Sequence, residues 1–310
     1  MSGKENEILF HQYDVSPFSE KVRTVFGIKQ LTWHAVEEPV IMPKPELTAL
    51  TGGYRKIPVM QIGADVYCDT QIIIRELERR YPKPSLFTEA DKGLAWAVSM
   101  WADRVLFQNA VAVIFGNVGQ AVDESFIKDR EALMGRPFDV NAMKAAAPLM
   151  AEQLRAGLGW LEDQLADGRK FLMGAAPGLA DAACHYNLAF MRWLFPDGLK
   201  VLEHLPKAAA WEERVRAIGH GDRQEMSRDE ALAIAKAATS TTKEQADPHE
   251  PNGLKPGDKV SVMADDYGRD PITGTLVASD AQSVAIKREA PEVGEVVVHF
   301  PRAGFFIVKA

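Results

Sequence analysis

The first 85 residues alternate short apolar runs with segments of helical periodicity. The apolar runs have the length of strands, and the last two are joined by the turn residues Gly63-Ala64-Asp65, which predicts a hairpin. Ser16-Pro17 and Asp69-Thr70 provide helix starts. The pattern places strands at 7–11, 31–36, 57–62 and 66–68 and helices at 16–30 and 69–80. This order predicts an α/β domain of mixed strand direction.

From Asp91 to about Ala238 the periodicity is almost wholly helical. The expected helices are 91–115, 140–166, 179–195, 206–218 and 227–238. No strand pattern interrupts them, and the sequence therefore predicts a helical bundle.

The end of the chain changes to the two-residue periodicity of strands. A polar, Pro-containing segment comes first and has the composition of a linker. Five short strands with Gly, Asp and Pro turns follow at 259–263, 274–278, 283–287, 295–300 and 304–308. They predict a small β-barrel, in which Phe300, Phe305 and Phe306 form either the core or a docking patch. The expected domains are residues 1–85, 90–240 and 254–310, with a linker at 241–253.

Composition and charge narrow the class of protein. A net charge of −7 argues against a general nucleic-acid binder, which would be basic. No apolar run reaches the ~20 residues that span a bilayer, and the polar start MSGKENEILF lacks the apolar core of a signal peptide. Two cysteines imply no disulfide framework. We therefore expect a soluble cytoplasmic protein that binds neither nucleic acid nor membrane.

Ser16-Pro17 at the first strand-to-helix turn is the first feature with chemical potential. Ser at the N-cap and Pro at the first helical position also form an ordinary helix start that needs no ligand. The alternative is functional, because the positive end of a helix favours a thiolate. A Ser hydroxyl there can donate a hydrogen bond to the sulfur and lower its pKa.

Two further sites follow in the same domain. A cis bond between Ile57 and Pro58 would turn the Ile57 backbone towards a cleft, where an extended peptide could pair with it, although an edge-strand proline by itself is the simpler explanation of the pattern. Asp69 and Thr70 either only cap the next helix or bind a ligand. In the second case Thr70 and the helix N-terminus would hold a carboxylate, and Asp69 would accept from an amino group.

The basic residues Lys44, Arg55 and Lys56 are available to a second carboxylate, although charges in a loop are usually only solvated. His11 and His185 have no partners at ligand spacing, and we expect no metal.

The runs SPFSEKVR, RKIPVMQIG and CDTQIIIRELERRYP together resemble the N-terminal domain of cytosolic glutathione transferases, closest to Ser-type classes such as tau. The helical segment FLMGAAPGLADAACHYNLAF is similar to a segment of the same family, with Gly178 in place of the usual Ser or Thr cap and Asp181 at the structural Asp. The resemblance covers roughly residues 6 to 220. The expected fold is then an α/β thioredoxin-like domain, an all-α helical bundle domain and a small C-terminal SH3-like β-barrel.

The resemblance also implies a function. Ser16 would be the catalytic residue that activates the sulfur of glutathione, the co-substrate, and Ile57, after which Pro58 follows, would pair with the cysteinyl backbone. Asp69 and Thr70 would bind the γ-glutamyl end, and Lys44 or Lys56 would lie near the glycyl carboxylate. The acceptor would be a small hydrophobic electrophile, and the protein would be a homodimer.

Alternatives to these roles remain open. Tyr13 is a rival to Ser16, because other classes of the family use Tyr as the donor to the thiolate. Glutaredoxin chemistry needs a Cys in the turn that Ser16 occupies. Met100, Arg104 and Phe107, at helical spacing, are either the wall of a second-substrate pocket, together with Tyr13, or simply core. The competing hypothesis for the whole protein is a transferase-like scaffold whose C-terminal β domain binds a partner.

Overall fold

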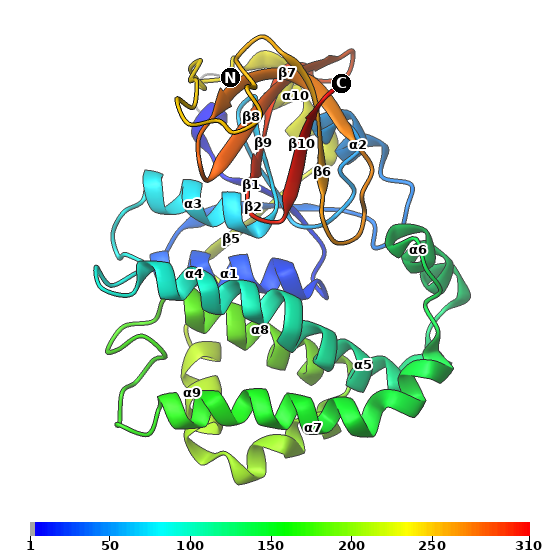
Figure 1. Cartoon of the computed structure of the whole chain (residues 1–310), viewed down its shortest axis with the longest axis vertical. Coiled ribbons are helices and arrows are strands. Elements are labelled where there is room, and N and C mark those ends of the chain that lie inside the picture. Colours follow the sequence, from blue (N-terminus) through cyan, green and yellow to red (C-terminus); the bar gives the residue numbers. More distant parts are fainter. Residues whose placement is uncertain (1–3) are drawn as a thin grey trace.

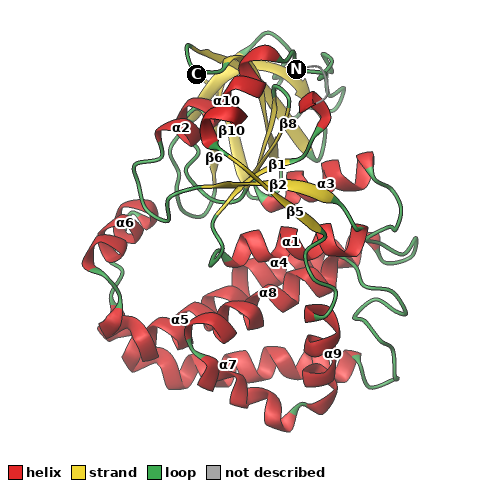
Figure 2. Ribbon diagram, turned by 180° about the vertical axis from the view of Figure 1, so that it is seen from behind, coloured by secondary structure: helices red, strands yellow, loops and turns green. Residues whose placement is uncertain are grey.

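In the computed structural model, which describes residues 4–310, a twisted sheet flanked by helices lies against a layer of long helices (Figure 1). The view from behind shows the same division, with α1 and α3 lying between the sheet and the bundle (Figure 2). The fold is thus a thioredoxin-like part, a helical part and a C-terminal β-rich region.

The strands and helices expected in the first 85 residues are confirmed, and one further short helix lies between the second and third strands. After a short 3-10 turn, η1 (Lys4–Asn6), they are β1 (Leu9–Gln12), α1 (Pro17–Lys29), β2 (Thr32–Glu37), α2 (Pro45–Thr51), β3 (Val59–Ile62), β4 (Asp65–Cys68) and α3 (Thr70–Arg80). β1 pairs in parallel with β2 and antiparallel with β3, and β3 and β4 form the expected hairpin. Phe10, Phe26 and Trp33 are fully buried and make ring contacts between β1, α1 and β2.

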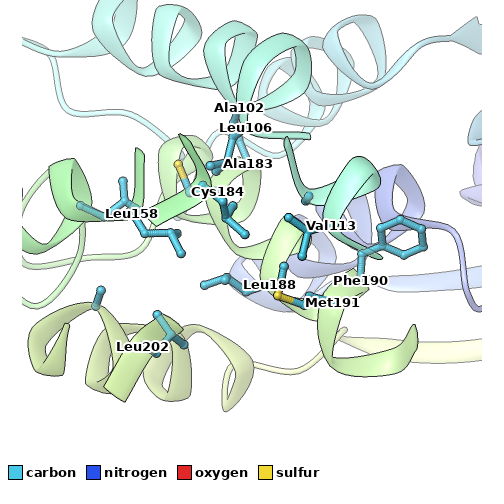
Figure 3. Packing of buried hydrophobic residues seen from close by; sticks show 14 of the residues in the cluster. Ala102, Leu106, Val113, Leu158, Ala183, Cys184, Leu188, Phe190, Met191 and Leu202 are labelled. Atoms are coloured by element: carbon cyan, nitrogen blue, oxygen red, sulfur yellow. The ribbon is translucent and has the colours of Figure 1, made fainter. Parts of the chain in front are cut away.

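The helical part contains α4 (Lys92–Trp101), a π-helical segment η2 (Ala102–Leu106), α5 (Phe107–Val118), η3 (Gly119–Ala121), α6 (Glu124–Met134), α7 (Val140–Gln164), α8 (Leu179–Leu194), η4 (Pro196–His204) and α9 (Pro206–Arg216). Its core lies between α5, α7 and α8, where Val113, Leu158 and Leu188 pack together (Figure 3). The sequence analysis missed α6, because none of its residues is buried and it therefore carries little apolar pattern.

Asp181 holds the start of α8, as expected for a structural Asp. Its carboxylate accepts from the Gly178 N–H at 2.9 Å, from the Leu172 N–H at 2.8 Å and from the Trp211 indole at 2.8 Å. The Asp side of the capping box is therefore present although Gly178 supplies no side chain.

The prediction of uninterrupted helix up to residue 238 is wrong. β5 (Asp222–Met226) pairs in parallel with β2 at one edge of the sheet, and α10 (Arg228–Ala237) packs on the sheet. Four of the five β5 residues are exposed, and the segment DRQEM therefore has no apolar alternation to reveal it.

All five C-terminal strands are confirmed, but they do not close into an SH3-like barrel. β6 (Lys259–Ala264), β7 (Ile272–Ser279), β8 (Ser283–Ala290), β9 (Gly294–Pro301) and β10 (Phe305–Lys309) form one end of an open ten-stranded sheet, in the order β10-β6-β7-β8-β9-β4-β3-β1-β2-β5. β9 pairs in parallel with β4, which would otherwise be an unpaired edge.

A shared hydrophobic core explains why these strands join the sheet. Leu47, Leu50, Val59 and Val66 of the thioredoxin-like part are buried in one cluster with Val260, Val262, Leu276, Val284, Ile286, Val296, Val298 and Phe300. Of the aromatic end, Phe300 is buried in this core, Phe305 is partly buried beside Tyr54, and Phe306 is exposed.

Candidate functional site

A cavity of ≈ 460 Å³ lies where the thioredoxin-like part, the helical part and the C-terminal strands meet. Every site residue predicted from the sequence lines it: Tyr13, Ser16, Lys44, Lys56, Ile57, Pro58, Asp69, Thr70, Met100, Arg104 and Phe107. Residues as far apart in the sequence as Tyr13 and Phe107 thus line the same cavity.

Ser16 caps α1 at the wall of the cavity. Its Oγ accepts a hydrogen bond from the Ser19 N–H at 3.2 Å, and Pro17 follows at the first helical position. The same hydroxyl also shares a side-chain hydrogen bond with the Tyr13 phenol, and its hydrogen can donate either to that phenol or to a ligand in the cavity. The first turn of α1 adds the positive end of the helix dipole at the same place.

Tyr13 lies in the same turn, where its carbonyl accepts from the Ser16 N–H at 3.0 Å, and it also lines the cavity. Burial raises the pKa of Tyr13, and hydrogen bonds with Ser16 and Arg130 only partly oppose that shift. The phenol is therefore neutral and can also act as a hydrogen-bond donor to a sulfur anion. The geometry thus brings both candidate donors to the cavity.

Asp69 and Thr70 open α3 on another wall. Asp69 has φ +93°, which is uncommon for a residue other than glycine, and its Oδ1 accepts from the Gln71 N–H at 2.8 Å. Among described residues 4–310 its carboxylate has no ion-pair partner, and burial raises its pKa. A buried carboxylate in this state is stabilised by a bound ammonium group.

Thr70 is tied to the helical part through a buried lysine. Lys21 Nζ donates to Thr70 Oγ1 at 3.1 Å and to Asp103 Oδ2 at 2.7 Å, and the Lys21 side chain is fully buried. The Thr70 hydroxyl keeps its own hydrogen for a ligand, because here it acts as acceptor. Lys21 falls four residues before Val25 on the apolar face of α1, a polar residue at a core position that the sequence analysis could have singled out.

The Ile57–Pro58 bond is cis. In the described part of the chain, neither the N–H nor the C=O of Ile57 has a hydrogen-bond partner, and both residues line the cavity. An extended peptide could satisfy these two groups by backbone pairing. The Met42–Pro43 and Lys83–Pro84 bonds are also cis, which the sequence did not indicate.

Of the three basic residues predicted near a carboxylate, two are already paired. Arg55 binds Asp129 of α6 at 2.5 Å, and Lys56 Nζ binds Asp266 Oδ1 at 3.0 Å. Lys44 differs, because its side chain has no ion pair or hydrogen bond within the described chain, and its Nζ lies 5.5 Å from the centre of the Tyr13 ring. Burial, followed by the charge of Arg130, lowers the pKa of Lys44 to about 8.

The helical part supplies a largely apolar wall. Phe107 contacts Phe18, Tyr186 and Phe190 through its ring, and Met100 lies in the last turn of α4, two residues before the π-helical segment. Arg104 also lines the cavity, but its guanidinium is bound to Asp265 at 2.5 Å. It therefore links the bundle to the C-terminal strands.

Several lining residues were not foreseen. They come from α6 and from two turns of the C-terminal strands, and they include Arg130, Leu133, Asp266, Tyr267, Gly304 and Phe305. In the sequence the run Asp265-Asp266-Tyr267-Gly268 reads as an ordinary turn between strands, because nothing local shows that the turn reaches a cavity.

No helix within residues 4–310 has the length and apolar character needed to cross a membrane. Across the same residues, no group of His, Cys, Asp or Glu side chains is arranged to hold a metal ion. Cys68 and Cys184 are both buried and unbonded to each other, and burial raises the pKa of each thiol.

Comparison with known proteins gives two family matches. Residues 10–85 match the model described as glutathione S-transferase, N-terminal domain, and residues 109–223 match a domain of unknown function. A probable glutathione S-transferase of rice, Oryza sativa subsp. indica, is 26% identical over 221 residues, which is 70% of this chain and 88% of the relative.

Among solved structures, a GST-like protein from Pseudomonas syringae is 34% identical, with a TM-score of 0.83. The match covers 98% of this chain and 100% of that one, and it therefore includes the C-terminal strands. The Tau class glutathione S-transferase of mango, Mangifera indica, is 19% identical, with a TM-score of 0.54 over 68% of this chain and 89% of its own. At that identity the mango structure shows a shared fold only.

Proposed function

Since the chain belongs to the glutathione transferase family, we propose that it binds glutathione in the cavity and joins glutathione through its sulfur to a small hydrophobic electrophile. One observation carries this proposal. Ser16, whose hydroxyl can donate to a ligand, lines a cavity that also contains an acid, Asp69, and a base, Lys44, neither of which has an ion-pair partner among residues 4–310. Such a cavity suits a thiol peptide with charges of both signs.

In this proposal each part of glutathione meets one group of residues. The γ-glutamyl ammonium is bound by Asp69, and its carboxylate by Thr70 and the N-terminus of α3. The cysteinyl backbone pairs with Ile57, and the glycyl carboxylate binds Lys44. Ser16 and the start of α1 then stabilise the thiolate over the thiol.

The chemical step is a substitution at an electrophilic carbon. The thiolate forms a C–S bond, and the leaving group departs with its electron pair. Met100 and Phe107 would hold the electrophile by apolar contact, whereas Arg104, bound to Asp265, would contribute only the aliphatic part of its side chain.

The test of this function combines binding with turnover. Titration calorimetry should show one glutathione bound per chain, and the protein should accelerate conjugation of a chloro-nitroaromatic electrophile. Absence of heat on titration, together with no rate above the uncatalysed one, would reject the proposal. Glutathione-dependent reduction of a peroxide without conjugation would keep the binding site but change the reaction.

Two further properties belong to the proposal because the family implies them. One is a homodimer, which light scattering would detect as twice the 34.2 kDa mass of the chain. The other is a cytoplasmic location, consistent with two free cysteines. A monomeric mass at micromolar concentration would contradict the first, and secretion of the native protein the second. The scaffold hypothesis is the less favoured one, since the C-terminal strands use most of their apolar side chains in the core of the molecule itself and leave Phe306 and Val308 of β10 exposed.

Lys44 gives the site a pH dependence that is separate from the thiol. Its pKa is about 8 in the ligand-free protein, and a bound carboxylate would raise it by stabilising the ammonium form. The affinity for an anionic ligand is then full below that pKa and is lost as the pH rises through it. For S-methylglutathione, which has no thiol to ionise, we expect affinity to fall about tenfold between about pH 7 and about pH 9.

The matched variant is Lys44→Arg, which keeps its charge over this range. The fall in affinity should be largely abolished in that variant, whereas Lys44→Gln should bind weakly at every pH. An equal pH dependence in the wild type and in Lys44→Arg would show that another group, such as the ligand's own amine, controls it.

A further inference from the structure

The loop between β6 and β7, residues 265–271, reaches across the cavity to both halves of the molecule. Asp266 Oδ1 binds Lys56 Nζ of the thioredoxin-like part at 3.0 Å, and Asp265 Oδ1 binds Arg104 of the helical part at 2.5 Å. The Gly268 N–H donates to the Leu133 carbonyl of α6 at 2.8 Å. Three different elements thus hold the loop in place.

These contacts use most of the hydrogen-bonding capacity of the Lys56 ammonium group. Its ammonium donates to the Asp266 carboxylate and, at 2.9 Å, to the Tyr267 carbonyl, and it lies 4.7 Å from the centre of the Tyr267 ring. Two of the three ammonium hydrogens are therefore directed at the loop. Lys56 has little left to offer a ligand, although it lines the cavity.

The charge balance of the cavity follows from this arrangement. Arg104 and Arg55 are paired with Asp265 and Asp129, and Lys56 with Asp266. Lys44, on the loop before α2, is the lining lysine without such a partner in the described chain. A ligand carboxylate near Lys56 would also meet the negative charge of Asp266, which makes that position unfavourable.

We propose that Asp266 is a specificity-determining residue. It holds the Lys56 ammonium away from the ligand, so that Lys44 alone of the two lysines binds the glycyl carboxylate of the ligand. The inference rests on the proposed function, because it concerns the glycyl end of bound glutathione. It makes the C-terminal strands part of ligand recognition. The loop sets how strongly the site distinguishes a free carboxylate from an uncharged ester at that end.

The experiment measures dissociation constants for glutathione and for its glycyl monoethyl ester, and takes their ratio. In Asp266→Asn, Lys56 becomes available to the carboxylate and the competing negative charge is gone. We expect glutathione to bind about tenfold more tightly than in the wild type, the ester to change little, and the ratio to rise about tenfold. Loosening of the loop would instead alter both ligands alike.

Asp270→Asn is the matched control, since it removes the same charge from the same loop at an exposed position that does not line the cavity. Its ratio should equal that of the wild type. In Lys44→Gln the ratio should fall towards one, because the carboxylate has lost its cation. Equal ratios in Asp266→Asn, Asp270→Asn and the wild type would overturn the inference while leaving the proposed function intact. Failure of the wild type to bind either ligand would overturn both.

Discussion

Replacing Ser16 with alanine should lower turnover of glutathione with an electrophile by about 10- to 100-fold, the cost of losing a hydrogen bond to a charged group. The Ser16 hydroxyl accepts from the Ser19 N–H and can donate its own hydrogen to the sulfur. Without it, the bound thiol should ionise at a higher pH, and the loss should therefore be greatest at neutral pH. Steady-state rates across a pH series measure both effects.

Two companion variants separate this role from its alternatives. Ser19→Ala removes a neighbouring buried hydroxyl from the same turn of α1, and turnover should stay near that of the wild type. Tyr13→Phe removes the rival donor and should have a smaller effect than Ser16→Ala. A larger loss in Tyr13→Phe would transfer the activating role to the Tyr13 phenol.

Deleting residues 254–310 should leave a chain that no longer folds cooperatively. The deleted residues include 11 of the 19 buried members of the core cluster that also contains Leu47, Leu50 and Val66, and β4 would lose its neighbour β9. Each buried Val, Leu or Ile side chain contributes about 1.5–3 kcal/mol, and a whole domain is stable by only about 5–15 kcal/mol. Soluble yield and the unfolding transition of the truncated chain measure the effect.

Proteolytic cleavage before the C-terminal strands, without their removal, is the control for this deletion. A protease site inserted in the exposed segment 243–246 should give two fragments that stay associated and unfold together, because the sheet and the core remain complete. A truncated chain that unfolds cooperatively and binds glutathione as the full chain does would contradict this account. In that case the C-terminal strands would be an independent module.

Much of the site was predictable because local chemistry marked it. Ser16 and Asp69 are helix caps, and Pro58 opens a strand, features that are visible in a few residues of sequence. The family resemblance then predicted that these residues belong to one glutathione-binding site. The roles assigned to the residues remain predictions, which the variants above test.

The parts that could not be predicted depend on contacts between distant segments. β5 is recognisable as a strand only through its pairing with β2, and no residue of α6 is buried. The pairing of Lys56 with Asp266 joins residues 210 positions apart, and no local pattern links them. The sequence predicted a closed barrel, whereas the strands form an open sheet. Strand periodicity shows which residues are buried, but it does not show which strand lies beside β9.

The most direct test of the central claim is a titration of bound glutathione against pH, followed by thiolate absorbance with the protein in excess. A free thiol ionises near ~8.5. The account predicts that the bound thiol ionises well below that value in the wild type and returns towards it in Ser16→Ala. A bound thiol that ionises like the free one in the wild type would contradict the claim that this cavity activates glutathione.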